Sequence, residues 1–243
     1  MKKQILRFLT AAFSAILLQS AAVSGQTFQL IHNAADPSLD SVDIYIYGQL
    51  VQSDFHFRQA LTFTLPPGNY PVGIAPGNSS SAADTVRLFN LNLLAGHHYI
   101  AMATGVNNTM PGMFSPNPEG RDISLDLILH DNVRTTAADT NNIDLIIMHG
   151  ATDAPAVDVI PTGVCSGPLV DSAMFGDFTG YLSLPEGGYS INITPANSNS
   201  TVIASYYADL NGLGGSSQAI RIRRRTTSRA RTSHTTQYSC HRQ

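Results

Sequence analysis

This sequence has few charges, few cysteines and no tryptophan. Only 13% of its 243 residues are charged, about half of the usual share in globular domains. So low a charge content excludes a coiled coil, a charged disordered chain and a long solvated helix bundle. The only cysteines are Cys165 and Cys240, which excludes a disulfide framework, and their spacing is not that of a metal-binding pair.

Lysine is absent after residue 3, and the remaining charges are unevenly distributed. Residues 26–220 contain all 17 acidic residues but only four arginines, which gives this body a formal charge of -13, against -3 for the whole chain. An acidic body repels nucleic acid, so we expect no nucleic-acid partner. Residues 221–243 contain seven arginines, and we predict a basic disordered tail or the product of a shifted reading frame.

The first 25 residues have the three parts of a secretory signal peptide. Lys2, Lys3 and Arg7 form a positive start, residues 8–18 are apolar, and small residues follow up to Gly25. The apolar stretch is shorter than the roughly 20 residues that span a bilayer. We therefore expect cleavage after Gly25 and a mature chain without a membrane-spanning segment, secreted or held at the cell surface.

The chain repeats itself at a spacing of roughly 115–119 residues. Segment 32–37, which begins with histidine, returns as segment 149–155, and each precedes an alternating Val-Asp-aliphatic stretch. The pattern Leu-Pro-x-Gly-x-Tyr occupies residues 65–70 and again residues 184–189. Because the matches keep their order, they indicate two copies of one domain.

Within each copy, apolar residues recur at every second position, which is the period of a β-strand. In segment 42–47, valine and isoleucine alternate with Asp43, Tyr45 and Tyr47, so these three residues are expected on the outward side. We predict an all-β fold of two tandem antiparallel β-sandwich domains with immunoglobulin-like proportions. The expected strands include residues 61–65, 70–74, 85–93, 99–104 and 123–129.

The domain bounds follow from where the strand pattern breaks. Residues 26–134 form the expected first domain, which includes the Pro- and Gly-rich loop 107–122 because the strand-like segment after this loop needs a sheet. Residues 141–220 form the expected second domain. It loses its apolar pattern after Gly215, so we expect it to be truncated at its C-terminal end, with an open sheet edge.

The repeated strings resemble the bacterial family called domain of unknown function 4397. The resemblance rests on residues 149–159, 179–189 and 193–196 in the second copy and on residues 31–37 and 65–70 in the first. Together the two copies cover about residues 28–220. The resemblance implies β-sandwich repeats on exported or cell-surface proteins, with no catalytic residues assigned.

Two His/Asp pairs with matched spacing are candidates for a metal site or for acid–base chemistry. They are His32 with Asp36 and His149 with Asp153. The alternative interpretation is that each histidine begins a strand and each aspartate caps backbone N–H groups in the turn that follows. We favour this structural interpretation, because the sequence identifies no third metal ligand.

Other clusters also favour structural roles. Asp36, Asp40 and Asp43 offer oxygen ligands to calcium, but no Asp-x-Asp-x-Asp-Gly loop is present and Asp43 fits the outward side of a strand. His97 and His98 have no histidine counterpart in the second copy, and we expect solvated turn residues.

Motifs for catalysis are missing as well. The sequence has no Gly-x-Ser-x-Gly elbow and no phosphate-binding glycine loop. Tyr45 and Tyr47 on an outward side are candidates for stacking on sugars, although tyrosine also packs across strands. We assign no catalytic, cofactor-binding or metal-binding residue and expect no cofactor.

The sequence is therefore interpreted as an exported, non-enzymatic protein. Its tandem modules are expected to be structural, adhesive or binding units at the cell envelope or outside the cell, with a cell-surface glycan or protein as partner. A carbohydrate-binding module is the first alternative. A metal-dependent hydrolase that uses the His/Asp pairs is the second.

Overall fold

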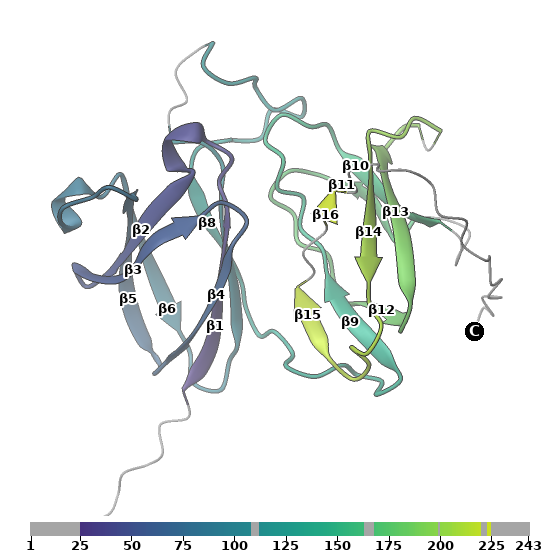
Figure 1. The fold of residues 1–243 in the computed structure, drawn as a ribbon, viewed down its shortest axis with the longest axis horizontal. Coiled ribbons are helices and arrows are strands. Elements are labelled where there is room, and N and C mark those ends of the chain that lie inside the picture. The colour runs from purple at the N-terminus through teal and green to yellow at the C-terminus, as the bar shows by residue number, and fades with distance from the viewer. Residues whose placement is uncertain (1–24, 108–111, 163–167, 199, 220–222, 225–243) are drawn as a thin grey trace, which may run out of the picture.

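The computed structural model describes residues 25–107, 112–162, 168–198, 200–219 and 223–224 (Figure 1). Strands dominate this part of the chain, whose helices are two short 3₁₀ turns, η2 (Pro37–Leu39) and η3 (Ala82–Asp84). The predicted all-β class is confirmed. None of the helices in these ranges has the length and hydropathy needed to cross a membrane. Residues 1–24 of the expected signal peptide, both cysteines and nearly all of the basic tail lie outside the described residues.

The first eight strands form one sandwich of two four-stranded sheets. The strand orders are β4-β1-β7-β8 and β3-β2-β5-β6. The expected strand 123–129 is observed slightly later as β8, which pairs antiparallel with β7, so the loop before it does return to this sandwich. The bounds are β1 (Gln26–Asn33), β2 (Ser41–Ile46), β3 (Gln49–His56), β4 (Ala60–Leu65), β5 (Gly68–Pro76), β6 (Arg87–Leu93), β7 (Tyr99–Thr104) and β8 (Asp126–His130).

Alternating apolar residues of both sheets fill the space between them. Val42 and Ile44 of β2 lie inside as the sequence predicts, and Phe28 and Leu30 of β1 meet them from the opposite sheet. Each of these side chains is almost fully buried. Burial of this apolar surface is the main term that stabilises such a sandwich.

The remaining strands form a second sandwich with its own core. Its sheets have the orders β12-β9-β15 and β11-β10-β13-β14-β16, and its buried apolar residues lie between Ile143 and Leu210. Figure 1 shows the two sandwiches side by side. The bounds are β9 (Asn142–Ile146), β10 (Val157–Thr162), β11 (Val170–Ala173), β12 (Leu182–Pro185), β13 (Gly188–Pro195), β14 (Ala204–Asp209), β15 (Ser217–Ala219) and β16 (Arg223–Arg224).

Both sandwiches place their strands in the same order, with one parallel pair in each. β1 pairs parallel with β7, and β9 pairs parallel with β15, whereas the other ladders are antiparallel. In an immunoglobulin sandwich the first strand shares a sheet with the second, fifth and fourth strands. Here it lies between the fourth and the seventh. The immunoglobulin likeness therefore extends to the architecture and not to the strand order.

The C-terminal end of the second sandwich is shorter than its counterpart. β15 takes the place of β7 but has three residues, and the described residues contain no strand in the place of β8. Thr136 of the connecting segment lies beside Ser216 in an isolated antiparallel bridge. The domain bounds 26–134 and 141–220 stay a prediction.

The repeated Leu-Pro-x-Gly-x-Tyr pattern forms the same hairpin in both sandwiches. The Tyr70 hydroxyl donates to the Pro66 carbonyl oxygen at 2.8 Å, and the Tyr189 hydroxyl donates to the Pro185 carbonyl oxygen at 2.7 Å. The phenol thereby ties the end of one strand to the start of the next. This hydrogen bond explains why tyrosine occurs at the same position of both hairpins.

Removal of this hydroxyl should weaken the second sandwich. Tyr189 is buried, so we expect Tyr189→Phe to lower the free energy of unfolding by about 1 kcal/mol, the usual net value of one hydrogen bond. Urea denaturation measures this change. Tyr207→Phe, at an exposed tyrosine of the same sandwich, is the matched control, and an equal loss in both variants would contradict the assignment.

Candidate functional site

His32 lies at the end of β1 with both ring nitrogens engaged. Its Nε2 is 2.7 Å from the Leu39 carbonyl oxygen, and its Nδ1 is 3.3 Å from the Ala34 amide nitrogen. The ring is 1% exposed and packs against Phe55 and Phe57. The imidazole therefore closes the turn between β1 and η2.

The two partners determine the tautomer of His32. A carbonyl oxygen only accepts and an amide N–H only donates, so Nε2 carries the hydrogen and Nδ1 presents its lone pair. Burial lowers the pKa of His32 below its ordinary value, and this effect prevails over the Leu39 carbonyl and Asp40, which favour the charged form. The neutral ring is the form that fits.

His149 repeats this arrangement in the second sandwich. Its Nε2 is 3.1 Å from the Pro155 carbonyl oxygen, and its Nδ1 accepts the Ala151 N–H at 3.3 Å. His149 follows β9, as His32 ends β1, so neither histidine begins a strand as expected. Both rings instead bind main-chain groups of the turn that follows the strand.

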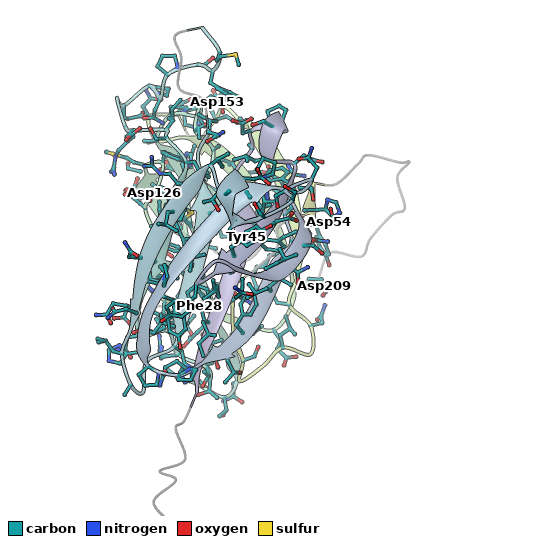
Figure 2. The ribbon with its side chains drawn as sticks, turned by 90° about the vertical axis from the view of Figure 1, so that its left-hand side faces the viewer. Phe28, Tyr45, Asp54, Asp126, Asp153 and Asp209 are labelled. Atoms are coloured by element: carbon teal, nitrogen blue, oxygen red, sulfur yellow. The ribbon has the colours of Figure 1, made fainter. Side chains whose placement is uncertain are left out.

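The two aspartates of the pairs do not behave alike. Asp36 is buried, and its carboxylate accepts the Ser38 N–H at 2.8 Å and the Asn107 N–H at 2.9 Å. Its counterpart Asp153 is exposed at one end of the molecule (Figure 2). The backbone-capping role predicted for both aspartates is thus observed for Asp36.

Asp43 was expected on the outward, solvent-exposed side of its strand. The exposure is wrong, because Asp43 is only 3% exposed. Its carboxylate accepts the Asp54 N–H at 3.0 Å and the Ser79 hydroxyl at 2.5 Å. Asp54 has a positive φ of 51° beside a register shift between β2 and β3. The buried carboxylate thus satisfies the N–H of an irregular strand.

Asp158 does the same in the second sandwich. Its carboxylate accepts the N–H of Ser172 at 2.8 Å, and Ser172 also has a positive φ, of 55°. Asp158 is 2% exposed. The repeated Val-Asp-aliphatic segments therefore place one buried carboxylate beside each irregular edge strand.

The two candidate sugar-stacking tyrosines separate in the structure. Tyr45 is 5% exposed, and its hydroxyl is 2.8 Å from the Ser79 hydroxyl (Figure 2). The candidate role of Tyr45 in sugar stacking is therefore wrong, because a sugar cannot reach the buried ring. Tyr47 is 61% exposed, and its ring lies 5.7 Å from the ring of Tyr70. The sequence did not single out Tyr70, which lies on the neighbouring strand β5.

His97 and His98 make specific contacts although they follow a turn. The Nδ1 atom of His97 is 2.8 Å from the Asp131 carboxylate, and the Nδ1 atom of His98 accepts the Thr27 N–H at 3.1 Å. Both side chains are partly buried. Both histidines thus stay partly solvated, and they also help to attach the start of β7 to neighbouring segments, which the sequence did not predict.

An open depression of about 480 Å³ lies over the turn that follows β1. Asp36 and Asp40 are its acidic residues, and Asp36 is engaged by backbone N–H groups. Across the described ranges, no three His, Cys, Asp or Glu side chains gather as a metal would require. The lining consists of Ala34, Ala35, Asp36, Pro37, Asp40 and Phe57.

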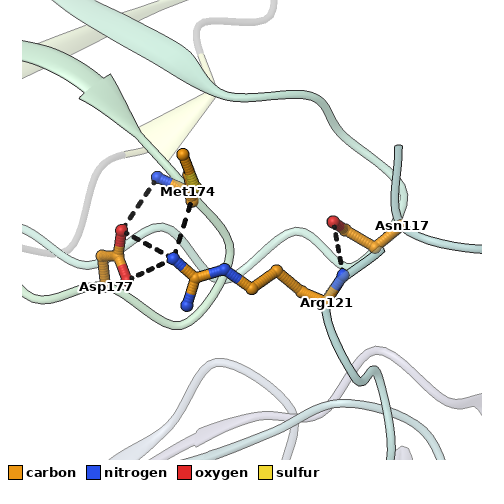
Figure 3. A network of polar contacts seen from close by, with 4 residues as sticks. All are labelled: Asn117, Arg121, Met174 and Asp177. Atoms are coloured by element: carbon orange, nitrogen blue, oxygen red, sulfur yellow. Dashed lines mark hydrogen bonds and ion pairs between the residues drawn. The ribbon is translucent and has the colours of Figure 1, made fainter. Parts of the chain in front are cut away.

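A polar contact network joins the two sandwiches. The Arg121 guanidinium lies 3.1 Å from the Asp177 carboxylate and 3.3 Å from the Met174 sulfur (Figure 3). Asn117 is buried and donates to the Thr152 carbonyl oxygen, while Glu119 accepts the Ala156 N–H at 2.8 Å. The sequence places these residues in a loop and contains no local pattern that predicts this contact.

The segment between the sandwiches is attached through Arg134. Its guanidinium lies 3.7 Å from the centre of the Tyr181 ring and 3.1 Å from the buried Asp144 carboxylate. His130 stacks on Phe178 with ring centres 5.0 Å apart. Contacts with the second sandwich are therefore made by β8 and by the segment that follows it, as well as by the loop before it.

A family model described as Domain of unknown function (DUF4397) matches residues 28–160, more than half of the chain. The chain belongs to the DUF4397 family. No curated protein matches the sequence.

The DUF4397 match begins in β1 and ends in β10. It therefore includes both histidine turns, His32 and His149, and the contact loop with Asn117, Glu119 and Arg121. The family resemblance noted in the sequence is confirmed.

Loss of the His32 side chain should destabilise the first sandwich and reduce its pH dependence. The unfolded chain binds a proton near pH 6.5 that the folded chain does not, so stability should fall as the pH drops below this value. We expect His32→Ala to cost on the order of 2 to 4 kcal/mol at pH 7 and to lose less stability between pH 7 and pH 5.

Urea denaturation at several pH values measures both effects. His56→Ala, at an exposed histidine of β3, is the control and should change stability little. An unchanged pH slope in His32→Ala would show that another group carries the pH dependence. His130, whose pKa burial also lowers, is the next candidate.

Proposed function

We propose that this protein is an exported, non-enzymatic member of its family whose β-sandwich modules act as structural, adhesive or binding units at the cell envelope or outside the cell. The observation that carries the proposal is the contact network between the sandwiches. Asn117, Glu119 and Arg121 from one loop bind two separate segments of the second sandwich, the turn with Thr152 and Ala156 and the turn with Asp177. A pair of modules held in this way suits a spacer that presents surfaces at a defined distance.

The His/Asp pairs support a structural function as well. Both nitrogens of His32 and of His149 bind main-chain groups, and the Asp36 carboxylate binds backbone N–H groups. A metal ligand or a general base needs a lone pair directed at its target. The metal-dependent hydrolase therefore has no geometric support at these pairs.

The spacer proposal predicts a fixed arrangement of the two sandwiches. Removal of the side-chain contacts by Asn117→Ala, Glu119→Ala and Arg121→Ala together should increase the radius of gyration per chain, because fewer contacts then hold the two modules in one arrangement. Small-angle X-ray scattering at a matched association state measures this change. Arg58→Ala, at an arginine that contacts Phe57 of its own sandwich, is the control. Equal scattering from all variants would contradict the spacer proposal.

Export is tested separately. Expression of the full chain with its own N-terminus should yield a protein outside the cytoplasm that begins at Gln26. Cell fractionation and N-terminal sequencing give the answer, and an uncleaved cytoplasmic protein would overturn the export part of the proposal.

Carbohydrate binding is the second candidate, and one observation favours it. Tyr47 is exposed beside Tyr70, which makes an aromatic surface suited to stacking on a sugar ring. If this surface binds sugars, Tyr47→Ala should abolish a signal on a glycan array, whereas Tyr45→Phe should keep it because Tyr45 is buried. An array without any wild-type signal would contradict carbohydrate binding, and the spacer proposal would then be the one that remains.

A further inference from the structure

The outer edges of the four sheets differ in how they are protected from pairing with another chain. An unprotected edge strand presents free N–H and C=O groups to any strand that approaches. Most edges in the described part of the chain are short, irregular or covered. β3 and β11 have register shifts, β8 has five residues and begins with an aspartate, and β12 has four residues and includes a proline. Thr136 lies beside β15, and β16 covers β14.

β6 is an exception among these edges. Its seven residues pair with β5 in an unbroken register, from Ile74 opposite Arg87 to Gly68 opposite Leu93. The strand contains no proline, lysine or acidic residue. Its Leu88 is 62% exposed, the largest value among the exposed apolar side chains. The remaining long edge, β4, presents the polar Thr62 and Thr64 instead.

The polar main-chain groups that β6 offers can be assigned from the pairing. The Tyr47 N–H donates to the Pro71 carbonyl oxygen, so the main chain of Pro71 faces β2 and that of the next residue, Val72, faces β6. Val72 lies opposite Phe89. The main chain of Phe89 therefore points toward β5, and that of Leu88, Asn90 and Asn92 points to the open edge.

The second sandwich shows that this edge position accepts an added strand. β14 occupies the place that β6 has in the first sandwich, and β16 pairs antiparallel with it, with Tyr207 opposite Arg223. The first sandwich has no such strand beside β6 in the described residues. Figure 1 shows β6 in the sheet that faces away from the second sandwich, so this module does not cover the edge.

We propose that β6 pairs antiparallel with β6 of a second copy of this chain, so that two four-stranded sheets become one eight-stranded sheet across a two-fold axis. The register with full overlap places Asn90 opposite its own copy, which sets Leu88 opposite Asn92 and Phe89 opposite Leu91. About six main-chain hydrogen bonds then form, because Leu88, Asn90 and Asn92 each exchange two with their partners. This proposal does not depend on the proposed function.

The side chains of this register are self-complementary. On the outer face, the two Asn90 amides can donate and accept across the axis, and each exposed Leu88 is covered by the neighbouring chain. On the inner face, each half-buried Phe89 meets Leu91 of the copy, an aromatic and aliphatic pair of the kind that stabilises sheets. Asn90 lies on the two-fold axis, where a charged side chain would face the same charge of the second copy.

A charge exchange at Asn90 tests the proposal on the purified full chain. Wild-type protein should sediment with twice the mass of one chain, and Asn90→Asp and Asn90→Lys should each sediment as one chain, because like charges meet at the axis. An equal mixture of the two variants should regain the doubled mass, since aspartate then faces lysine. Thr62→Asp and Thr62→Lys on β4 are the matched controls and should keep the wild-type mass.

Three results would overturn the proposal. They are a wild-type mass of one chain at every concentration, a doubled mass that both Asn90 variants keep, and a mixture that stays at one chain. Far-ultraviolet circular dichroism verifies that each variant is folded. Hydrogen exchange adds a second measurement, because the amides of Leu88, Asn90 and Asn92 should exchange more slowly in the wild type than in Asn90→Asp.

Discussion

Main-chain groups that leave a buried strand need hydrogen-bond partners in the interior, and two matched pairs of buried side chains supply several of them in this protein. His32 and His149 each accept the N–H two residues later and donate to a carbonyl oxygen beyond the turn. Asp43 and Asp158 each accept the N–H of a residue with positive φ on the neighbouring edge strand. An unpaired N–H at any of these places would cost about 1 to 3 kcal/mol.

This constraint explains why residues with reactive side chains recur at matched positions. A histidine followed by an aspartate four residues later has the composition of a catalytic or metal-binding pair, but the ring nitrogens of His32 and His149 are already bonded to the backbone. The same turn built twice needs the same imidazole twice. A repeated chemical group is therefore a sign of repeated architecture here.

The relation between the sandwiches depends on polar contacts from a loop that precedes β8. In this loop, Arg121 forms an ion pair with Asp177, Glu119 accepts the Ala156 N–H, and Asn117 donates to the Thr152 carbonyl oxygen. Arg134 attaches the connecting segment to Tyr181 and Asp144. Each contact joins residues 10 to 56 positions apart in the chain. The long loop between β7 and β8 thus connects two modules that have separate apolar cores.

Local patterns in the sequence determined the all-β class, the two-residue period of β2 and the hairpin turns, because a strand places alternate side chains on opposite faces whatever surrounds it. The strand order and the parallel pairing of β1 with β7 depend on segments about 70 residues apart, which no local pattern encodes.

Only the tertiary structure decided what an outward position means. Asp43 and Tyr45 lie on the side of β2 that alternation assigns to solvent, but Ser79, from the segment after β5, bonds to both side chains. Thr85 lies close against Gly73 of the same sheet. When a segment folds over a sheet, the outer face of the sheet becomes buried. The strand's own sequence cannot predict this burial, because the covering segment lies far away along the chain.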